Sequence, residues 1–326
     1  MTESRSQTLA ASINSSLAGL MEADDRVVLL GEDIGRLGGV FRVTRGLQAT
    51  FGPQRVRDTT LAESSIVGQA IGMSLSGLLP ICEIQFDGFC FPAANQIITQ
   101  AARLHGRWGG TDDLHLVVRI PSGGGTRGVE HHSESNESIF AAVPGLRVAY
   151  PSTGEDHRAV LDEALATPGP VLLYEPIRLY WKRVPPAPAA VPPRHPMAVR
   201  TVRPGTDVTL VTYGAMTLTA LAAADEVASE VDVEVLDLRW ISPIDHDGVL
   251  ESVRRTGRLL VVQESCLTHG VGAEVAATVA EHAFTSLKSP VRRMGAPHEP
   301  MPPANDEYHH VVQHKDIVQA LLEVVS

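Results

Sequence analysis

The chain has 326 residues, of which 44% are hydrophobic and 20% charged, and its net charge is −11. A single hydrophobic core stops growing at roughly 250 to 300 residues, so this length predicts two domains. The composition excludes a membrane-spanning helix, which needs about 20 consecutive apolar residues, and the acidic balance disfavours nucleic acid as a partner.

At the start of the chain, the first twenty residues predict a helix. They do not form a secretory signal, because Glu3 and Arg5 come early and no basic start precedes a compact apolar core. The cysteines Cys82, Cys90 and Cys266 are scattered and form no CxxC pair, which argues against disulfides and a zinc site. We therefore expect a soluble protein in the reducing cytoplasm.

In the first half, β-rich runs alternate with helical patterns. This alternation predicts βαβ units, an α/β fold whose parallel sheet is covered by helices on both faces. The strands are expected at 27–30, 81–86, 114–120 and 171–174, and the helices at 66–78, 93–104 and 158–166.

After residue 182 the character changes to the proline-rich run VPPAPAAVPPRHP. Proline cannot donate to a sheet ladder or continue a helix, so residues 183–205 are expected to be a linker. Beyond it a second, smaller α/β domain is predicted. Its strands are expected at 208–213, 233–236 and 259–263, and its helices at 218–228, 247–253, 273–284 and 316–325.

The segment 58–65 places Glu63 after a probable strand and directly before an apolar helix. A glutamate in the first turn of a helix often only complements the helix dipole or caps the helix. Ligands in open α/β sheets, however, bind at the carboxyl ends of the strands. Spacing alone leaves both interpretations of Glu63 open.

Two loops follow later strands. In 83–89, polar Glu83 and Gln85 alternate with apolar residues, which usually indicates one solvated face, although the neighbouring sequence is too apolar for a simple exposed edge. The run 121–128 is glycine-rich, but it lacks the Lys-Ser/Thr ending of a phosphate-binding loop. A mobile loop fits that run better than a nucleotide site.

The polar segment EHHSESNE at 130–137 holds two imidazoles and three carboxylates. It could bind a metal, or it could be a helix start capped by Ser135 with exposed histidines. Adjacent histidines in an extended segment point in opposite directions, so at most one of His131 and His132 is expected to face a shared site. The GxSxG elbow of a serine nucleophile is absent.

Taken together, these segments resemble one family. The sequence contains GEDIGRLGGVFRVTRGL, RVRDTTLAESSIVGQAIGMSLSGLLPICEIQFDGFCFPAANQI, EHHSESNESIF, VEVLDLRWISPID and TGRLLVVQES. In order and over essentially the whole chain, they are similar to the β subunit of the decarboxylase component of 2-oxo acid dehydrogenases. EHHSES and LYEPIRLYW are most similar to bacterial branched-chain (2-oxoisovalerate) dehydrogenases, with pyruvate and acetoin dehydrogenases close behind.

The resemblance implies a transketolase-like pyrimidine-binding domain over 1–182, the linker 183–205 and a transketolase C-terminal domain over 206–326. It also implies a thiamine diphosphate site. Glu63 matches the catalytic carboxylate that bonds the aminopyrimidine ring and promotes its imino tautomer. Leu61, Gln85 and Phe89 match cofactor-contacting positions, and His132 matches the catalytic histidine that faces the substrate and the incoming lipoyl group.

No GDG with a downstream asparagine, the magnesium-diphosphate motif of this class, is found. In the family that half of the site and its Mg²⁺ belong to an α subunit, and the cofactor lies between the subunits of an α2β2 tetramer. The resemblance therefore implies an α partner, a lipoyl acyltransferase core as a second partner, and poor cofactor binding by this chain alone.

Relatives also hold a structural potassium ion. The matching positions here are Leu114, Leu116, Val117, Ala164, Thr167 and Gly169. Thr167 and Gly169 replace an Asp and an Asn, so the ion would depend on backbone carbonyls. The segment 294–308 lacks some of the usual family residues, which predicts altered partner docking.

The expected reaction is oxidative decarboxylation of a branched-chain 2-oxo acid with reductive acylation of a lipoyl group. The alternatives are a pyruvate or acetoin dehydrogenase β subunit, the C-terminal half of a split transketolase, and a non-catalytic scaffold. EIQF with FPAANQI argues against the split transketolase. A scaffold would be expected to lack Glu63 or His132, and both are present.

Overall fold

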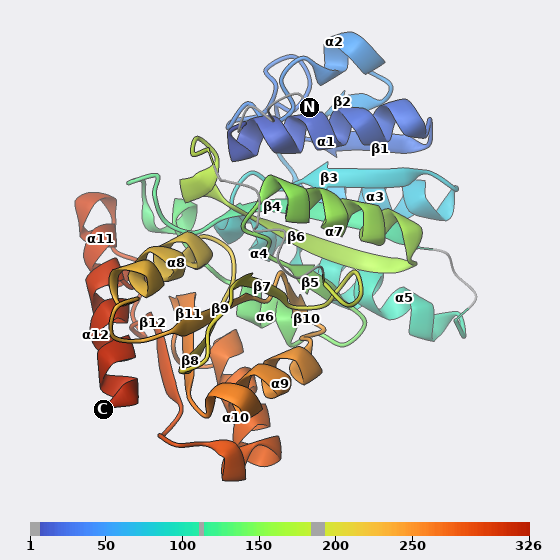
Figure 1. The fold of residues 1–326 in the computed structure, drawn as a ribbon. Helices are drawn as coiled ribbons and strands as arrows, with labels where there is room; N and C mark the ends of the chain where they lie inside the picture. Colours follow the sequence, from blue (N-terminus) through green and yellow to red (C-terminus); the bar gives the residue numbers. More distant parts are fainter. Residues whose placement is uncertain (1–6, 111–113, 184–192) are drawn as a thin grey trace, which may run out of the picture.

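The computed structural model describes residues 7–110, 114–183 and 193–326, which form two sheets with their helices (Figure 1). The first sheet has the order β10-β5-β6-β4-β3-β1-β2, and all neighbours are parallel except β10 and β5. Its strands are β1 Val27–Gly31, β2 Val56–Asp58, β3 Leu79–Glu83, β4 His115–Ser122, β5 Arg147–Ala149, β6 Gly169–Pro176 and β10 Trp240–Ser242.

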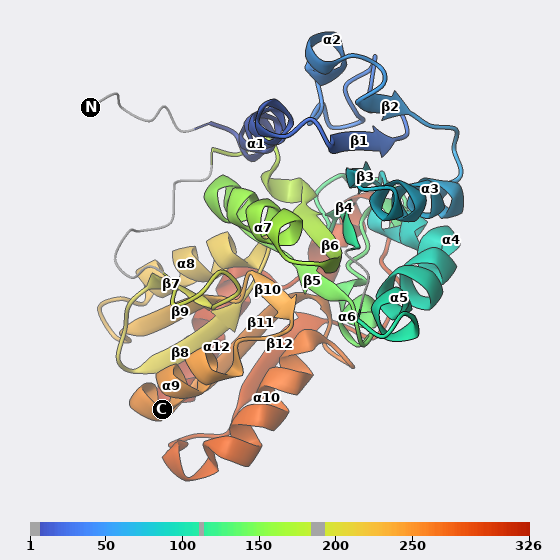
Figure 2. The ribbon, with the colours of Figure 1, turned by 90° about the vertical axis from the view of Figure 1, so that its right-hand side faces the viewer.

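Helices cover both faces of this sheet, as Figure 2 shows. On one face lie α1 Leu9–Ala23 and α7 Gly154–Ala166, and on the other lie α3 Glu63–Leu75, α4 Cys90–Ala94 and α5 Ala102–Arg107. The side chains of Thr8 and Thr153 cap α1 and α7 by accepting hydrogen bonds from backbone N–H groups of the first turn. Two apolar clusters, one on each face, bury the central strands completely.

The second sheet has the order β12-β11-β8-β9-β7, with β7 antiparallel to β9. Its strands are β7 Arg200–Arg203, β8 Val208–Thr212, β9 Val233–Asp237, β11 Leu259–Cys266 and β12 Arg292–Ala296. Helices α8 Met216–Glu226 and α12 His314–Val325 cover one face, and α9 His246–Thr256 and α10 Val271–His282 cover the other. The short helices are α2 Leu47–Phe51, α6 Glu137–Ala141 and α11 Glu307–His310.

The α/β class and the parallel sheet with helices on both faces are confirmed, but several predicted bounds were wrong. The strand expected at 81–86 ends at Glu83, so Gln85 lies in the loop after it. The helix expected at 93–104 is continuous from Cys90 to Arg107, but its middle, Asn95–Ala101, is a π-helix. Helix α3 begins three residues earlier than expected, so Glu63 is its first residue.

Part of the predicted linker, residues 183–205, forms a strand of the second sheet. Residues 184–192 lie outside the described residues, whereas β7 falls inside the expected linker and pairs with β9 at the edge of the second sheet. In the other direction, Trp240 of β10 pairs with Ala149 and joins the first sheet. The division at 182 and 206 stays a prediction. Within the described parts of the chain, no helix is long and apolar enough to cross a membrane.

Candidate active site

The loops that follow β1, β2, β3 and β4 lie along one edge of the first sheet, because these strands are parallel and adjacent. The carboxyl ends of the strands in such a sheet are the usual place for a ligand. Five predicted site residues come from these loops. Leu61 and Glu63 follow β2, Gln85 and Phe89 follow β3, and His132 follows β4.

Glu63 lies at the start of α3 and is only 8% exposed. Among the described residues it has no ion-pair partner, so its charge is not neutralised by a neighbouring cation. A second carboxyl group, that of Glu32 after β1, is also buried and accepts a hydrogen bond from the backbone N–H of Ala62. Burial and the charge of Glu63 raise the pKa of Glu32. The two carboxyl groups thus form a buried acidic pair.

Gln85 extends this group, because its side-chain amide donates a hydrogen bond of 3.4 Å to the backbone carbonyl of Glu32. Next to it, Phe86 begins an aromatic cluster. Its ring centroid is 4.2 Å from that of His132 and 5.9 Å from that of Phe89. Phe89 also contacts His132, at 5.6 Å. The structure therefore brings Glu63, Gln85, Phe89 and His132 to one edge, in two adjoining groups.

The two histidines do not behave as an extended pair. Glu130–His132 is a 3-10 helix, and the rings of His131 and His132 lie together, with centroids 4.5 Å apart. Both rings contact Phe89, so the expectation that they point in opposite directions was wrong. Gly88 permits this packing, because a Cβ there would lie 2.7 Å from the carbonyl oxygen of His131. Burial and the charge of His131 lower the pKa of His132.

The buried carboxylate of Asp87 connects the loop after β3 with the end of β4 and with the segment before α6. Its Oδ2 accepts hydrogen bonds from the Oγ of Ser122 at 3.0 Å and from the backbone N–H of Asn136 at 2.6 Å. Burial, with the charge of Glu137 adding to it, raises the pKa of Asp87 to about 8. Helix α6 begins after Asn136, and the Oγ of Ser135 has no hydrogen-bond partner, so the predicted cap by Ser135 was wrong.

Leu61 lies two residues before Glu63 and differs from the other predicted site residues in its exposure. It is 79% exposed. The metal interpretation of the segment 130–137 finds no support, since the described residues contain no group of three or more His, Cys, Asp or Glu side chains that could hold an ion.

The predicted potassium positions gather where β4, the end of α7 and the start of β6 meet. The guanidinium of Arg147 lies at the same place. Its Nη2 donates to the carbonyl oxygens of Thr167 at 2.6 Å and Gly169 at 2.9 Å. The backbone N–H of Gly169 donates to the carbonyl of Leu114 at 2.7 Å. Because an internal cation already bonds two of the expected carbonyl ligands, these residues do not fit a potassium ion well.

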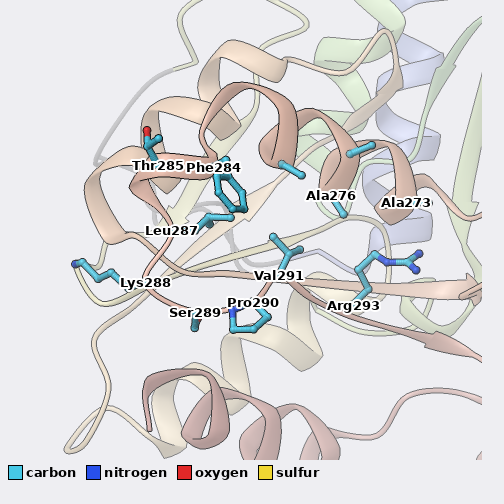
Figure 3. Close-up of a pocket in the computed structure, with 12 residues that line it drawn as sticks. Ala273, Ala276, Phe284, Thr285, Leu287, Lys288, Ser289, Pro290, Val291 and Arg293 are labelled. Carbon is cyan, nitrogen blue, oxygen red and sulfur yellow. The ribbon is translucent and has the colours of Figure 1, made fainter.

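A separate groove of about 910 Å³ lies in the second α/β unit, between α10 and the segment 284–293 (Figure 3). Alanines of α10 and the exposed Phe284 line it, together with the cations Lys288 and Arg293. Its lining is mostly apolar and carries no carboxyl or imidazole group. We therefore place the acid-base chemistry at the edge of the first sheet.

Residues 5–182 match the pyrimidine-binding domain of transketolase, and residues 198–317 match the transketolase C-terminal domain. The chain is 47% identical to the pyruvate dehydrogenase E1 component subunit beta of Leifsonia xyli subsp. xyli, over 93% of this chain and 90% of that one. The chain belongs to the E1 β-subunit family of the 2-oxo acid dehydrogenases. Membership of this family implies dependence on thiamine diphosphate and an α-subunit partner.

Other E1 β relatives differ in substrate. The 3-methyl-2-oxobutanoate dehydrogenase subunit beta of Mycobacterium tuberculosis is 44% identical, over 93% of this chain and 87% of that one. Among solved structures, a split gene transketolase, an inactive β4 tetramer, superposes with a TM-score of 0.80 at 23% identity, covering 98% of both chains. That likeness shows the fold alone.

Sequence reasoning missed three buried carboxylates at this edge. Glu32 had a signal, since it directly follows an apolar strand, as Glu63 nearly does. Glu264 and Glu307 had none. They come from the second half of the chain and bond the loop that carries His132, which is more than 130 residues away in sequence.

Proposed function

We propose that the chain is the β subunit of a thiamine-diphosphate-dependent dehydrogenase that decarboxylates a branched-chain 2-oxo acid and transfers the acyl group to a lipoyl group. The observation that carries the proposal is the buried, unpaired carboxyl group of Glu63 at the carboxyl edge of the first sheet. A buried carboxyl group with no neighbouring cation can hydrogen-bond a ring nitrogen of a cofactor and share a proton with it.

The residues at this edge suit an aminopyrimidine ring. We assign Glu63 the hydrogen bond to a ring nitrogen, Gln85 a polar contact, and Phe89 and Leu61 apolar packing. When bound, thiamine diphosphate would supply the nucleophilic carbon and the electron sink that decarboxylation of a 2-oxo acid needs. The protein's part is to hold a proton at Glu63 and to exclude water around the reacting atoms.

We assign His132 proton donation or orientation during acyl transfer to the lipoyl dithiolane. Its contacts with Phe86 and Phe89 fix the direction of the ring, and its lowered pKa favours the neutral imidazole. A neutral ring donates a hydrogen bond from one nitrogen and can accept a proton at the other, and the imidazolium so formed can return that proton.

In this proposal, the chain supplies the part of the thiamine diphosphate site that holds the aminopyrimidine ring, and another subunit supplies the part that holds the diphosphate. Leu61, assigned to the cofactor, is exposed, and the sequence lacks the motif that binds Mg²⁺ and the diphosphate. We propose that an α subunit covers Leu61 and brings the Mg²⁺ in an α2β2 tetramer, and that a lipoyl acyltransferase core binds the assembled enzyme in the cytoplasm.

The substrate assignment rests on the resemblance of EHHSES at 130–135 to branched-chain enzymes. The alternative, pyruvate, is favoured by the 47% identical relative, whose name is that of a pyruvate dehydrogenase subunit. The test is to co-purify the chain with its α subunit and to measure thiamine-diphosphate-dependent decarboxylation of 3-methyl-2-oxobutanoate and of pyruvate. The chain without the α subunit is the control.

The proposal predicts turnover that needs both subunits and a higher kcat/KM for 3-methyl-2-oxobutanoate. A higher kcat/KM for pyruvate would contradict the branched-chain substrate, but it would not contradict the proposed reaction or the role of the α subunit. Full activity of this chain without the α subunit would contradict the shared site.

A further inference from the structure

The loop after β4 has an unusual backbone path. It runs from Gly123 to the 3-10 helix Glu130–His132, and the φ angles of Gly123, Gly125 and Arg127 are +86°, +117° and +55°. Backbone of this kind turns successive N–H groups toward a common point, which suits a carboxylate or another anion. Such a loop is stable only if these N–H groups find an acceptor.

The acceptor is Glu307, which is 182 residues away from Gly125 in the sequence. Its Oε1 accepts a hydrogen bond from the N–H of Gly125, and its Oε2 accepts one from the N–H of Arg127 at 3.1 Å. The same Oε2 accepts a third from the Oγ of Ser133 at 2.9 Å. Glu307 begins α11 and is 6% exposed. One buried carboxylate therefore bonds both ends of the segment that contains His132.

A second buried carboxylate reinforces the contact. Oε1 of Glu264, in β11, accepts a hydrogen bond from the N–H of Gly124 at 2.8 Å and pairs with Nη2 of Arg178 at 2.5 Å. In addition, the backbone N–H of Ala304 donates to the carbonyl of Gly128 at 2.9 Å. The second half of the chain thus bonds five residues of the loop, which are Gly124, Gly125, Arg127, Gly128 and Ser133.

The glycines of the loop permit this close approach. A Cβ on Gly124 would lie 2.6 Å from Oε1 of Glu307, and one on Gly125 would lie 3.1 Å from the Cβ of Arg178. Distances this short exclude larger residues unless the carboxylate moves. The glycine-rich run therefore serves packing against Glu307, whereas the sequence suggested only a mobile loop.

We propose that Glu307 is a positioning residue that holds the His132 loop, so that the second domain controls the geometry of the catalytic edge. Without its carboxylate, the N–H groups of Gly125 and Arg127 lose their acceptor, and Ser133 loses its partner next to His132. The His132 ring then samples positions away from Phe86. The catalytic consequence rests on the proposed function, whereas the restraint of the loop does not.

The variant Glu307→Ala should fold. A cavity of about 330 Å³, lined by Gly125, Arg127, Glu307 and Tyr308 among others, adjoins the carboxylate. It has room for water, which can hydrate the released N–H groups. The matched control is Asp306→Asn, which removes one exposed carboxylate from the neighbouring position. Glu307→Gln keeps one acceptor oxygen and should lie between the wild type and Glu307→Ala.

The experiment uses the full chain assembled with its α subunit and has two readouts. The first is the rate of trypsin cleavage after the exposed Arg127, identified by mass spectrometry of the fragment that begins at Gly128. The second is kcat and the KM for thiamine diphosphate. Cleavage depends on opening of the loop and needs no turnover.

We expect cleavage after Arg127 to become roughly tenfold faster or more in Glu307→Ala, as the loss of charge-assisted hydrogen bonds implies. We expect kcat to fall by about the same factor, with an unchanged KM for the cofactor, because Glu63 is not disturbed. Asp306→Asn should match the wild type in both readouts.

Unchanged cleavage in Glu307→Ala would overturn the restraint, and faster cleavage with unchanged kcat would overturn the control of catalysis. If the wild-type complex decarboxylates neither 2-oxo acid, the proposed function fails, but the cleavage rates still decide whether Glu307 holds the loop.

Discussion

The imidazole ring of His132 packs edge-on against the phenyl ring of Phe86, with 4.2 Å between their centroids. This contact contributes to the burial of the imidazole, and burial lowers the pKa of His132. The charge of the adjacent His131 lowers it further, because a second positive charge nearby is unfavourable. The pair of histidines is therefore an electrostatic unit as well as an aromatic one.

His131→Asn should raise the pKa of His132. The substitution removes the neighbouring positive charge but leaves the packing against Phe86, so protonation of His132 becomes easier. The acid limb of the pH dependence of kcat should move to higher pH, and the imidazole signal of His132 in an NMR titration should move with it. An acid limb that stays in place or moves to lower pH would contradict this coupling.

Asp87 predicts a pH-dependent stability. Its pKa is raised from 3.8 to about 8 by burial, so the folded protein binds a proton that the unfolded chain releases near pH 4. Its contribution to stability is complete below about pH 4 and is lost as the pH rises through about 8. The free energy of unfolding of the wild type should therefore fall, relative to that of Asp87→Asn, between these two values.

Urea unfolding at several pH values measures this difference. The control is Asp247→Asn, which removes an exposed carboxylate at the start of α9 and should leave the pH dependence unchanged. A difference between wild type and Asp87→Asn that does not vary with pH would contradict the shifted pKa.

Because of the contacts of Arg147, we expect that the protein does not need potassium for its stability. Its guanidinium bonds the carbonyls of Thr167 and Gly169, so the melting temperature should be equal in KCl and NaCl at the same ionic strength. Arg147→Ala should lower the free energy of unfolding by about 1 kcal/mol, because the carbonyls of Thr167 and Gly169, which are exposed and partly buried, lose a charged donor. The exposed pair of Arg158 and Asp162 supplies the control. Arg158→Ala should cost only about 0.5 kcal/mol or less.

Potassium should then partly restore Arg147→Ala, since removal of the guanidinium frees the carbonyl oxygens. A wild-type melting temperature that rises in KCl but not in NaCl would show that an ion binds despite Arg147.

Local signals were sufficient for most of the fold. The central strands β1, β4 and β6 are rich in apolar residues because helices cover both faces, and such runs are visible in the sequence even though β4 and β6 carry the buried pair of Arg119 and Glu175. The end of β3 was not visible. The alternation of polar and apolar residues continues through Gln85 and Phe86, although the strand ends at Glu83. The π-helix at 95–101 has no distinct apolar pattern, so periodicity alone predicted an ordinary helix.

The sequence likewise indicated some residues of the candidate site and missed others. Glu63, Gln85, Phe89 and His132 were found through a resemblance, and spacing alone left Glu63 undecided. Contacts across the chain could not be predicted, because Glu307 and Gly125 are 182 residues apart in the sequence. The short edge strands β7 and β10 were missed for a related reason, since their pairing partners come from distant segments.

The central claim is that Glu63 is the catalytic carboxyl group of a thiamine-diphosphate enzyme. The most direct measurement is kcat for 3-methyl-2-oxobutanoate and for pyruvate in complexes with the α subunit that contain the wild type, Glu63→Gln or the exposed-site control Glu22→Gln. We expect kcat to fall at least about 100-fold in Glu63→Gln, the usual effect of losing a positioned proton-transfer group, and to stay unchanged in Glu22→Gln. A Glu63→Gln complex with kcat within about twofold of the wild type would contradict the account.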